Sequence, residues 1–117
     1  MSIPVDLADL PARISELGAS ALLVTNSVDG SPHVSSVVVT CERAHLAMGV
    51  GRRTRVNTAA NPAITLVWPA VDGEHCLIVD GRARDAISEP LVMVPASAVL
   101  HRLAQAPTEP RPEERHE

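Results

Sequence analysis

Apolar residues near the start of the chain recur at helical spacing, whereas those further along form short runs. Over residues 6–18 they return every three or four positions, which predicts an amphipathic helix with an apolar stripe at Leu7, Leu10, Ile14 and Leu17. We expect this helix to be capped near Asp9 and to end at Gly18. A single apolar stripe on a short helix predicts a lid that packs over a sheet.

Short apolar runs separated by turn residues predict a mainly β fold for the rest of the domain. Five runs are clear strands, at residues 21–26, 33–40, 45–50, 63–68 and 76–83, and two are weaker candidates, at 91–94 and 98–103. Asp29-Gly30 and Asp72-Gly73 mark two of the turns, and Gly81 indicates a bulge or a tight bend inside its strand. With the N-terminal helix and one short helix inserted before residue 61, these strands predict a small β-barrel of α+β character.

The chain divides into one domain and a tail. Residues 1–105 hold the predicted barrel, and residues 106–117 contain three prolines, four glutamates and no apolar residue larger than Ala106. Such a segment cannot bury enough apolar surface to order itself, so we expect a disordered, acidic, proline-rich tail.

The core must be built almost entirely from aliphatic side chains. Phe and Tyr are absent, and Trp68 is the only aromatic residue of the chain. We expect Trp68 in the core or at a subunit interface, with contact to a ligand as the alternative.

The two cysteines and the termini bear on location. Cys41 and Cys76 are far apart and lie in no Cys-x-x-Cys motif, and the five histidines form no metal-site pattern. The N-terminus lacks the features of a secretory signal, and no apolar run approaches the length of a membrane span. We therefore expect a cytoplasmic protein that has two ordinary thiols, no membrane partner and no metal site.

A polar cluster follows the third predicted strand, where glycines at positions 49 and 51 break the apolar run. All ten basic residues of the chain are arginines, and three of them occupy four positions of this cluster, which consists of Arg52, Arg53, Thr54, Arg55 and Asn57. Because a helix start presents unpaired N–H groups and a partial positive charge, arginines placed there predict an anion pocket. The alternative is a solvated loop in which the arginines pair with nearby carboxylates.

The charge balance indicates what kind of anion this is. The chain has a formal net charge of −4, so the arginine cluster is a basic spot on an acidic protein. Nucleic acid requires a broad basic face, whereas a planar guanidinium matches the oxygens of a single phosphate. We therefore expect a small phosphate-bearing ligand and no nucleic acid.

Three segments together resemble a known family. The sequences DGSPHVSSVVV, GRRTRVNTAANPAITLVWP and LIVDGRA, in this order, resemble the pyridoxamine 5′-phosphate oxidase-like family of flavin-binding split barrels. The resemblance covers roughly residues 3–103 and is greatest to very short members found in actinobacterial-type genomes. It implies a six-stranded split β-barrel that forms a homodimer, with flavin mononucleotide (FMN) or a deazaflavin coenzyme in clefts at the subunit interface.

The resemblance also implies which residues bind the cofactor. The cofactor phosphate is expected at Arg52, Arg53, Thr54 and Asn57, and the flavin ring is expected beside His33, Val34, Ser35 and Ser36. The backbone of Val50 and Gly51 completes that wall. No catalytic residue is assigned, because in flavin chemistry the cofactor carries the reaction and the protein orients it.

Three functions are consistent with these features. The first is a flavin- or deazaflavin-dependent oxidoreductase that acts on an unidentified small substrate. The second is a flavin-binding or flavin-carrying homodimer without turnover, and the third is a degenerate barrel that binds no flavin.

Overall fold

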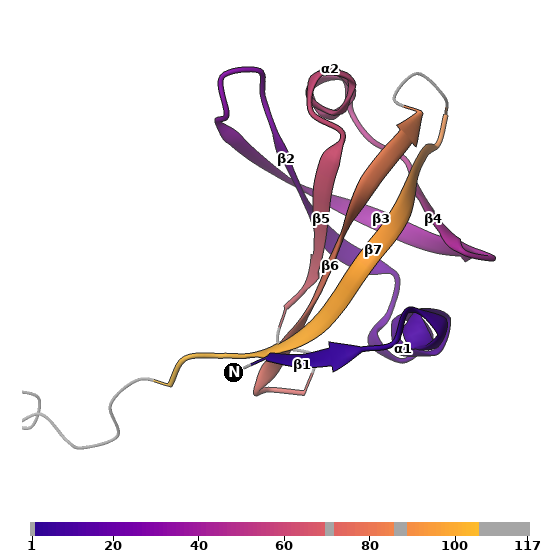
Figure 1. Cartoon of the computed structure of the whole chain (residues 1–117), viewed down its shortest axis with the longest axis vertical. Coiled ribbons are helices and arrows are strands. Elements are labelled where there is room, and N and C mark those ends of the chain that lie inside the picture. The colour runs from indigo at the N-terminus through magenta and orange to yellow at the C-terminus, as the bar shows by residue number, and fades with distance from the viewer. Residues whose placement is uncertain (1, 70–71, 86–88, 106–117) are drawn as a thin grey trace, which may run out of the picture.

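The structure, a computed structural model, describes residues 2–69, 72–85 and 89–105, and in these ranges the chain forms seven strands and three helical segments (Figure 1). In chain order these are β1 (Ser2–Val5), the 3-10 helix η1 (Leu7–Asp9), α1 (Leu10–Leu17), β2 (Ser20–Asn26), β3 (Pro32–Glu42), β4 (His45–Met48), α2 (Arg52–Ala60), β5 (Ala63–Trp68), β6 (His75–Asp85) and β7 (Leu91–Arg102). The tail predicted at residues 106–117 lies outside the described residues.

Six of the strands close into an antiparallel barrel. The order of the sheet is β1-β7-β4-β3-β2-β5-β6, and β6 pairs again with β7, so that β2 to β7 form a complete ring. The strand β1 lies outside the ring and pairs with the second half of β7. A mainly β barrel with an N-terminal helix and one inserted helix is thus confirmed.

The C-terminal strand differs from the prediction. Residues 91–94 and 98–103 were expected as two weak strands, but β7 runs through both of them without a break. Its register on β6 shifts between Asp80–Ser97 and Gly81–Pro95, which leaves Ala96 as an extra residue in a bulge. A proline is tolerated at a bulge because it has no N–H to donate to the ladder. The bend predicted at Gly81 is confirmed as one side of this bulge.

The N-terminal helical segment begins with η1. The carboxylate of Asp6 caps η1 by accepting a bond of 3.0 Å from the N–H of Ala8. The cap predicted near Asp9 is confirmed in position, since Asp9 is the N-cap residue of α1, although its side chain makes no capping hydrogen bond. The end at Gly18 is confirmed, since its φ of 98° leaves the helical region and its N–H still donates to Ile14 O at 2.9 Å. None of the helices in the described ranges is long and apolar enough to cross a bilayer.

The core fills the barrel with aliphatic side chains, as the composition required. Fully buried residues come from β2, β5, β6 and β7, and they include Leu23, Leu66, Leu77, Val79, Leu91 and Met93. Trp68 is also in the core, with 2% of its surface exposed, and its Nε1 donates to Gly18 O at 3.0 Å. This bond attaches the end of α1 to the barrel.

Candidate functional site

The helix α2 carries the polar cluster and lies at one end of the barrel, opposite the end covered by α1 (Figure 1). Its N-cap is Gly51 in extended conformation, and its first hydrogen bond runs from Arg55 N to Gly51 O at 3.2 Å. The last bond runs from Asn61 N to Asn57 O at 2.7 Å, and Pro62 prevents a further turn. A glycine before the helix and a proline after it therefore set its length.

The start of α2 is an electropositive surface. The side chains of Arg52 and Arg53 are exposed, and no acidic residue lies in the first turn. Because the hydrogen-bond ladder begins at Arg55, the N–H groups of the preceding helical residues point out of the helix end. Two long guanidinium side chains and several backbone N–H donors at one helix end can hold an anion such as a phosphate.

Arg55 differs from the other two arginines. Its Nη2 lies 2.5 Å from Glu89 Oε2, and only 20% of its side-chain surface is exposed. The alternative of carboxylate pairing therefore applies to Arg55, whereas the anion pocket expected at Arg52 and Arg53 stays a prediction. Arg52 and Arg53 face solvent at the helix start, whereas Arg55 joins α2 to the segment that precedes β7.

Thr54 and Asn57 lie on the inner face of α2. Thr54 is 1% exposed and Asn57 is 2% exposed, and Asn57 Nδ2 donates to Thr25 Oγ1 at 3.1 Å. These two residues were predicted to hold the cofactor phosphate together with Arg52 and Arg53. In the structure they face the barrel, and Asn57 holds the helix on β2.

The bond between Asn57 and Thr25 can be measured with a double-mutant cycle. We expect Asn57→Ala to lower the free energy of unfolding by about 2 kcal/mol, because it leaves a buried hydroxyl without its donor. The variants Asn57→Ala and Thr25→Val, alone and together, should give a coupling free energy of about 1 kcal/mol in urea unfolding. If the two single effects add up to the double effect, the bond does not hold α2 in place.

The four residues predicted beside the flavin ring alternate along β3. His33 and Ser35 are half-buried, and they pair with Thr25 and Leu23, which face the barrel interior. Val34 and Ser36 are exposed on the outer face. Since neighbouring side chains of a strand point to opposite faces, one flat ring can contact one of these pairs through side chains and the other only through backbone.

Val50 and Gly51 connect β4 to α2. Val50 is half-buried against the core, and Gly51 is exposed as the N-cap residue. Their backbone leads directly into the start of α2, and the contact with the flavin ring that the resemblance implied for it stays a prediction.

A further residue, Asn61, holds the neighbouring hairpin in position. Its Nδ2 donates to Ser27 O at 2.7 Å and to Asn26 O at 3.3 Å, which attaches the end of α2 to the β2–β3 turn. In that turn the carboxyl group of Asp29 accepts hydrogen bonds from the Ser27 hydroxyl and from the Ser31 N–H. These bonds, the one from Ser27 first, lower the pKa of Asp29 to about 2. The sequence indicated Asn61 only as the residue that ends the helix, because contacts across 34 and 35 positions leave no local signal.

Comparisons with known proteins identify the fold but not the family. No protein-family model matches the chain. The uncharacterized proteins Mb0449c of Mycobacterium bovis and MT0457 of Mycobacterium tuberculosis are each 43% identical to it over 68 residues. The match takes in 52% of this chain and 47% of each relative, so it spans about half the length of these relatives.

Solved structures match over most of the chain at low sequence identity. The heme storage protein HutZ from Vibrio cholerae has a TM-score of 0.60 at 12% identity, with 84% of this chain and 96% of HutZ covered. An FAD-binding protein from Mycobacterium smegmatis has a TM-score of 0.60 at 18% identity, with 89% and 100% covered. An F420 reductase has a TM-score of 0.53 at 18% identity, with 78% and 93% covered. The fold is therefore the split barrel found in flavin- and heme-binding proteins.

Proposed function

We propose that this chain is a member of the pyridoxamine 5′-phosphate oxidase-like family that binds FMN, or a deazaflavin coenzyme, at the start of α2. The observation that carries the proposal is the pair of exposed arginines, Arg52 and Arg53, at a helix start without acidic residues. Solved structures named as an FAD-binding protein and an F420 reductase share the barrel fold, and α2 lies at one end of this barrel.

The residues present fit the phosphate of such a cofactor. Arg52 and Arg53 supply guanidinium donors, and the N–H groups of the first turn supply further donors at the positive end of the helix. Asn57 and Asn61 position these donors from beneath, by fixing α2 to β2 and to the β2–β3 turn. Thr54 is buried in the same turn of α2 and presents almost no surface to solvent.

A bound flavin or deazaflavin would supply hydride transfer, and this chain's residues bind and orient it. We propose an oxidoreductase that acts on a small molecule, with no protein nucleophile in the reaction. Cys41 and Cys76 are both free thiols, which supports a reducing compartment, and we place the protein in the cytoplasm.

The outer face of β2 and β3 supports a homodimer. Val38 is 61% exposed, Val34 is 56% exposed and Leu22 is 37% exposed, and Leu22 pairs with Ser36, which lies between the two valines on the same face. Exposing aliphatic side chains to water is unfavourable, so covering a group of them on one face of a sheet with a second apolar surface lowers the free energy. We propose a second copy of the chain as that surface, with the cofactor held near the junction of the two copies.

Native mass spectrometry of the full chain, alone and with FMN or the deazaflavin coenzyme added, tests both proposals. We expect a dimer that carries two cofactor masses. The double variant Arg52→Gln/Arg53→Gln should weaken cofactor binding at least about tenfold, because each lost charge-assisted hydrogen bond contributes more than 1 kcal/mol.

The matched control is Arg13→Gln/Arg102→Gln, which removes two exposed arginines outside α2 and should leave the affinity unchanged. Equal affinity of the two double variants would overturn the phosphate site, and a bare monomer would overturn the flavin-binding dimer. If the loaded protein is reduced by NAD(P)H but no member of a substrate panel reoxidises it, the carrier function replaces the oxidoreductase.

A further inference from the structure

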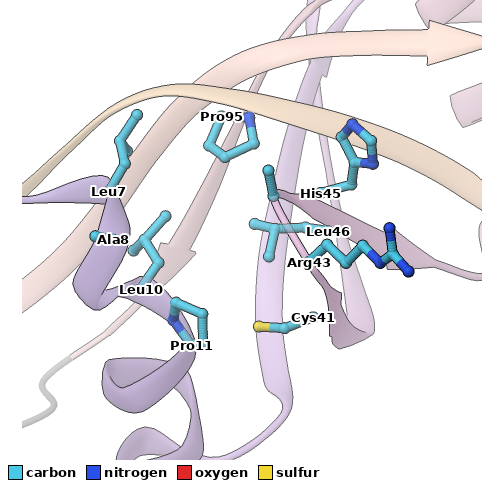
Figure 2. Close-up of a pocket in the computed structure, with 10 residues that line it drawn as sticks. Leu7, Ala8, Leu10, Pro11, Cys41, Arg43, His45, Leu46 and Pro95 are labelled. Atoms are coloured by element: carbon cyan, nitrogen blue, oxygen red, sulfur yellow. The ribbon is translucent and has the colours of Figure 1, made fainter.

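A cavity of about 270 Å³ lies between the η1–α1 segment and the β3–β4 turn, at the end of the barrel away from α2 (Figures 1 and 2). Figure 2 shows Leu7, Leu10 and Pro11 on one side of it and Leu46 and Cys41 on the other. Burial raises the pKa of the Cys41 thiol, so Cys41 belongs with the uncharged lining. The body of the cavity is therefore apolar.

The edge of this cavity on the β4 side is cationic. Arg43 and His45 line it, and Arg84 Nη1 lies 3.2 Å from Nε2 and 3.5 Å from Nδ1 of His45. Arg84 is the extra residue at the second register shift of β6, between Ala83 and Asp85, and a bulge of this kind redirects a side chain. Arg84, from β6, thus contacts the imidazole of His45, and Arg43, from the turn between β3 and β4, lines the same side of the cavity.

The described residues do not neutralise these arginines. In the ranges that the structure covers, neither Arg43 nor Arg84 has a carboxylate within ion-pair distance. Glu42 lies directly across the ladder from His45, but it is exposed and joins neither arginine in an ion pair in those ranges. The edge can therefore receive an anion from outside the chain.

The apolar space is longer than this one cavity. A second cavity, of about 350 Å³, shares Pro11 and Cys41 with the first and continues along α1 past Ile14 to Gly18. Figure 2 shows Pro11 and Cys41 facing one another at this junction. An extended apolar chain fits two cavities that adjoin in this way better than a compact ring does.

We propose that these cavities bind a fatty acid, with its carboxylate at Arg43 and the Arg84–His45 pair and its alkyl chain along α1. The inference is independent of the proposed flavin site, since none of these residues belongs to α2. It gives the N-terminal lid a ligand-binding role besides its role in covering the barrel.

Calorimetric titration of the full chain with octanoate tests the proposal, with octan-1-ol and octylamine as probes of the same length. We expect octanoate to bind at least about tenfold more tightly than octan-1-ol, because hydrogen bonds to a charged group contribute more than those to a neutral one. Octylamine should bind most weakly because its charge is repelled. Equal affinities of octanoate and octan-1-ol, or no binding of octanoate, would overturn the proposal.

Variants locate the binding. Arg43→Gln should weaken octanoate binding about tenfold, whereas Arg102→Gln, which removes an exposed arginine far along β7, should leave it unchanged. Bound octanoate should also slow alkylation of Cys41 and not that of Cys76, which lies outside both cavities. An Arg43→Gln variant that melts normally and keeps full affinity would overturn the assignment, as would an unchanged alkylation rate of Cys41. Either result would leave the proposed FMN site unaffected, because that site rests on different residues.

Discussion

The variant Trp68→Ala is expected to lose about 4 kcal/mol of stability, a large part of what a domain of this size has. Trp68 is 2% exposed, and it is the only aromatic side chain available to fill the barrel. The surrounding aliphatic residues belong to strands that a closed ring holds in place, so they cannot move inward to fill the space.

Urea unfolding followed by circular dichroism measures this loss, since removing Trp68 also removes the fluorescent reporter. Trp68→Phe provides the comparison, because it keeps most of the apolar volume and loses the bond from Nε1 to Gly18 O. We expect Trp68→Phe to lower the free energy of unfolding by about 1–2 kcal/mol, because it leaves the carbonyl of Gly18 without its donor and puts a smaller ring in the core. If Trp68→Phe is as damaging as Trp68→Ala, the hydrogen bond to the end of α1 matters more than the volume of the ring.

The second large effect is expected at Gly81, where Gly81→Ala should destabilise the barrel by about 3 kcal/mol. A Cβ atom at this position would overlap the carbonyl oxygen of Val94 and would lie 2.9 Å from Pro95 Cα and 2.8 Å from Met93 Cε. Two of these atoms belong to the backbone of β7, which pairs with Gly81 at the bulge, so an added methyl group would push the two strands apart.

The matched control for this prediction is Gly49→Ala. Nothing lies within 4 Å of a Cβ built at Gly49, and its φ is not in the left-handed region, so we expect little change in the urea midpoint. A loss of equal size in both variants would mean that the flexibility of glycine, rather than the close approach of β7 to Gly81, determines the result.

The strands of the barrel could be predicted because each has a local signal. Runs of valine and leucine bounded by Asp-Gly turns correspond to β2, β3, β5 and β6 within a few residues. The continuity of β7 could not be predicted, because Pro95 breaks its pattern and only the bulge opposite Gly81 makes the proline acceptable. The strand β1 is four residues long and contains Pro4, so nothing but its pairing with β7 makes it a strand.

Some features of the candidate site could likewise be predicted from local signals in the sequence, and others could not. The arginines at the start of α2 could be predicted, because glycine, arginine and proline are local signals of a helix and its charge. The pairing of Arg55 with Glu89 could not, since it joins residues that are far apart in the chain. The direction of Asn57 toward Thr25 also depends on how the helix docks on β2, and a short polar helix has no apolar stripe that would indicate its inner face.

The position of β7 has a consequence for how the protein is made. This strand pairs with β4, with β6 and with β1, so one C-terminal segment closes the ring and also orders the other end of the chain. While the chain is being synthesised, β4 and β6 each have an unpaired edge until β7 emerges. Exposed edges of this kind invite pairing with other chains, and contacts between distant segments form slowly. We therefore expect newly made chains to be most prone to aggregation in the interval before β7 joins β4 and β6.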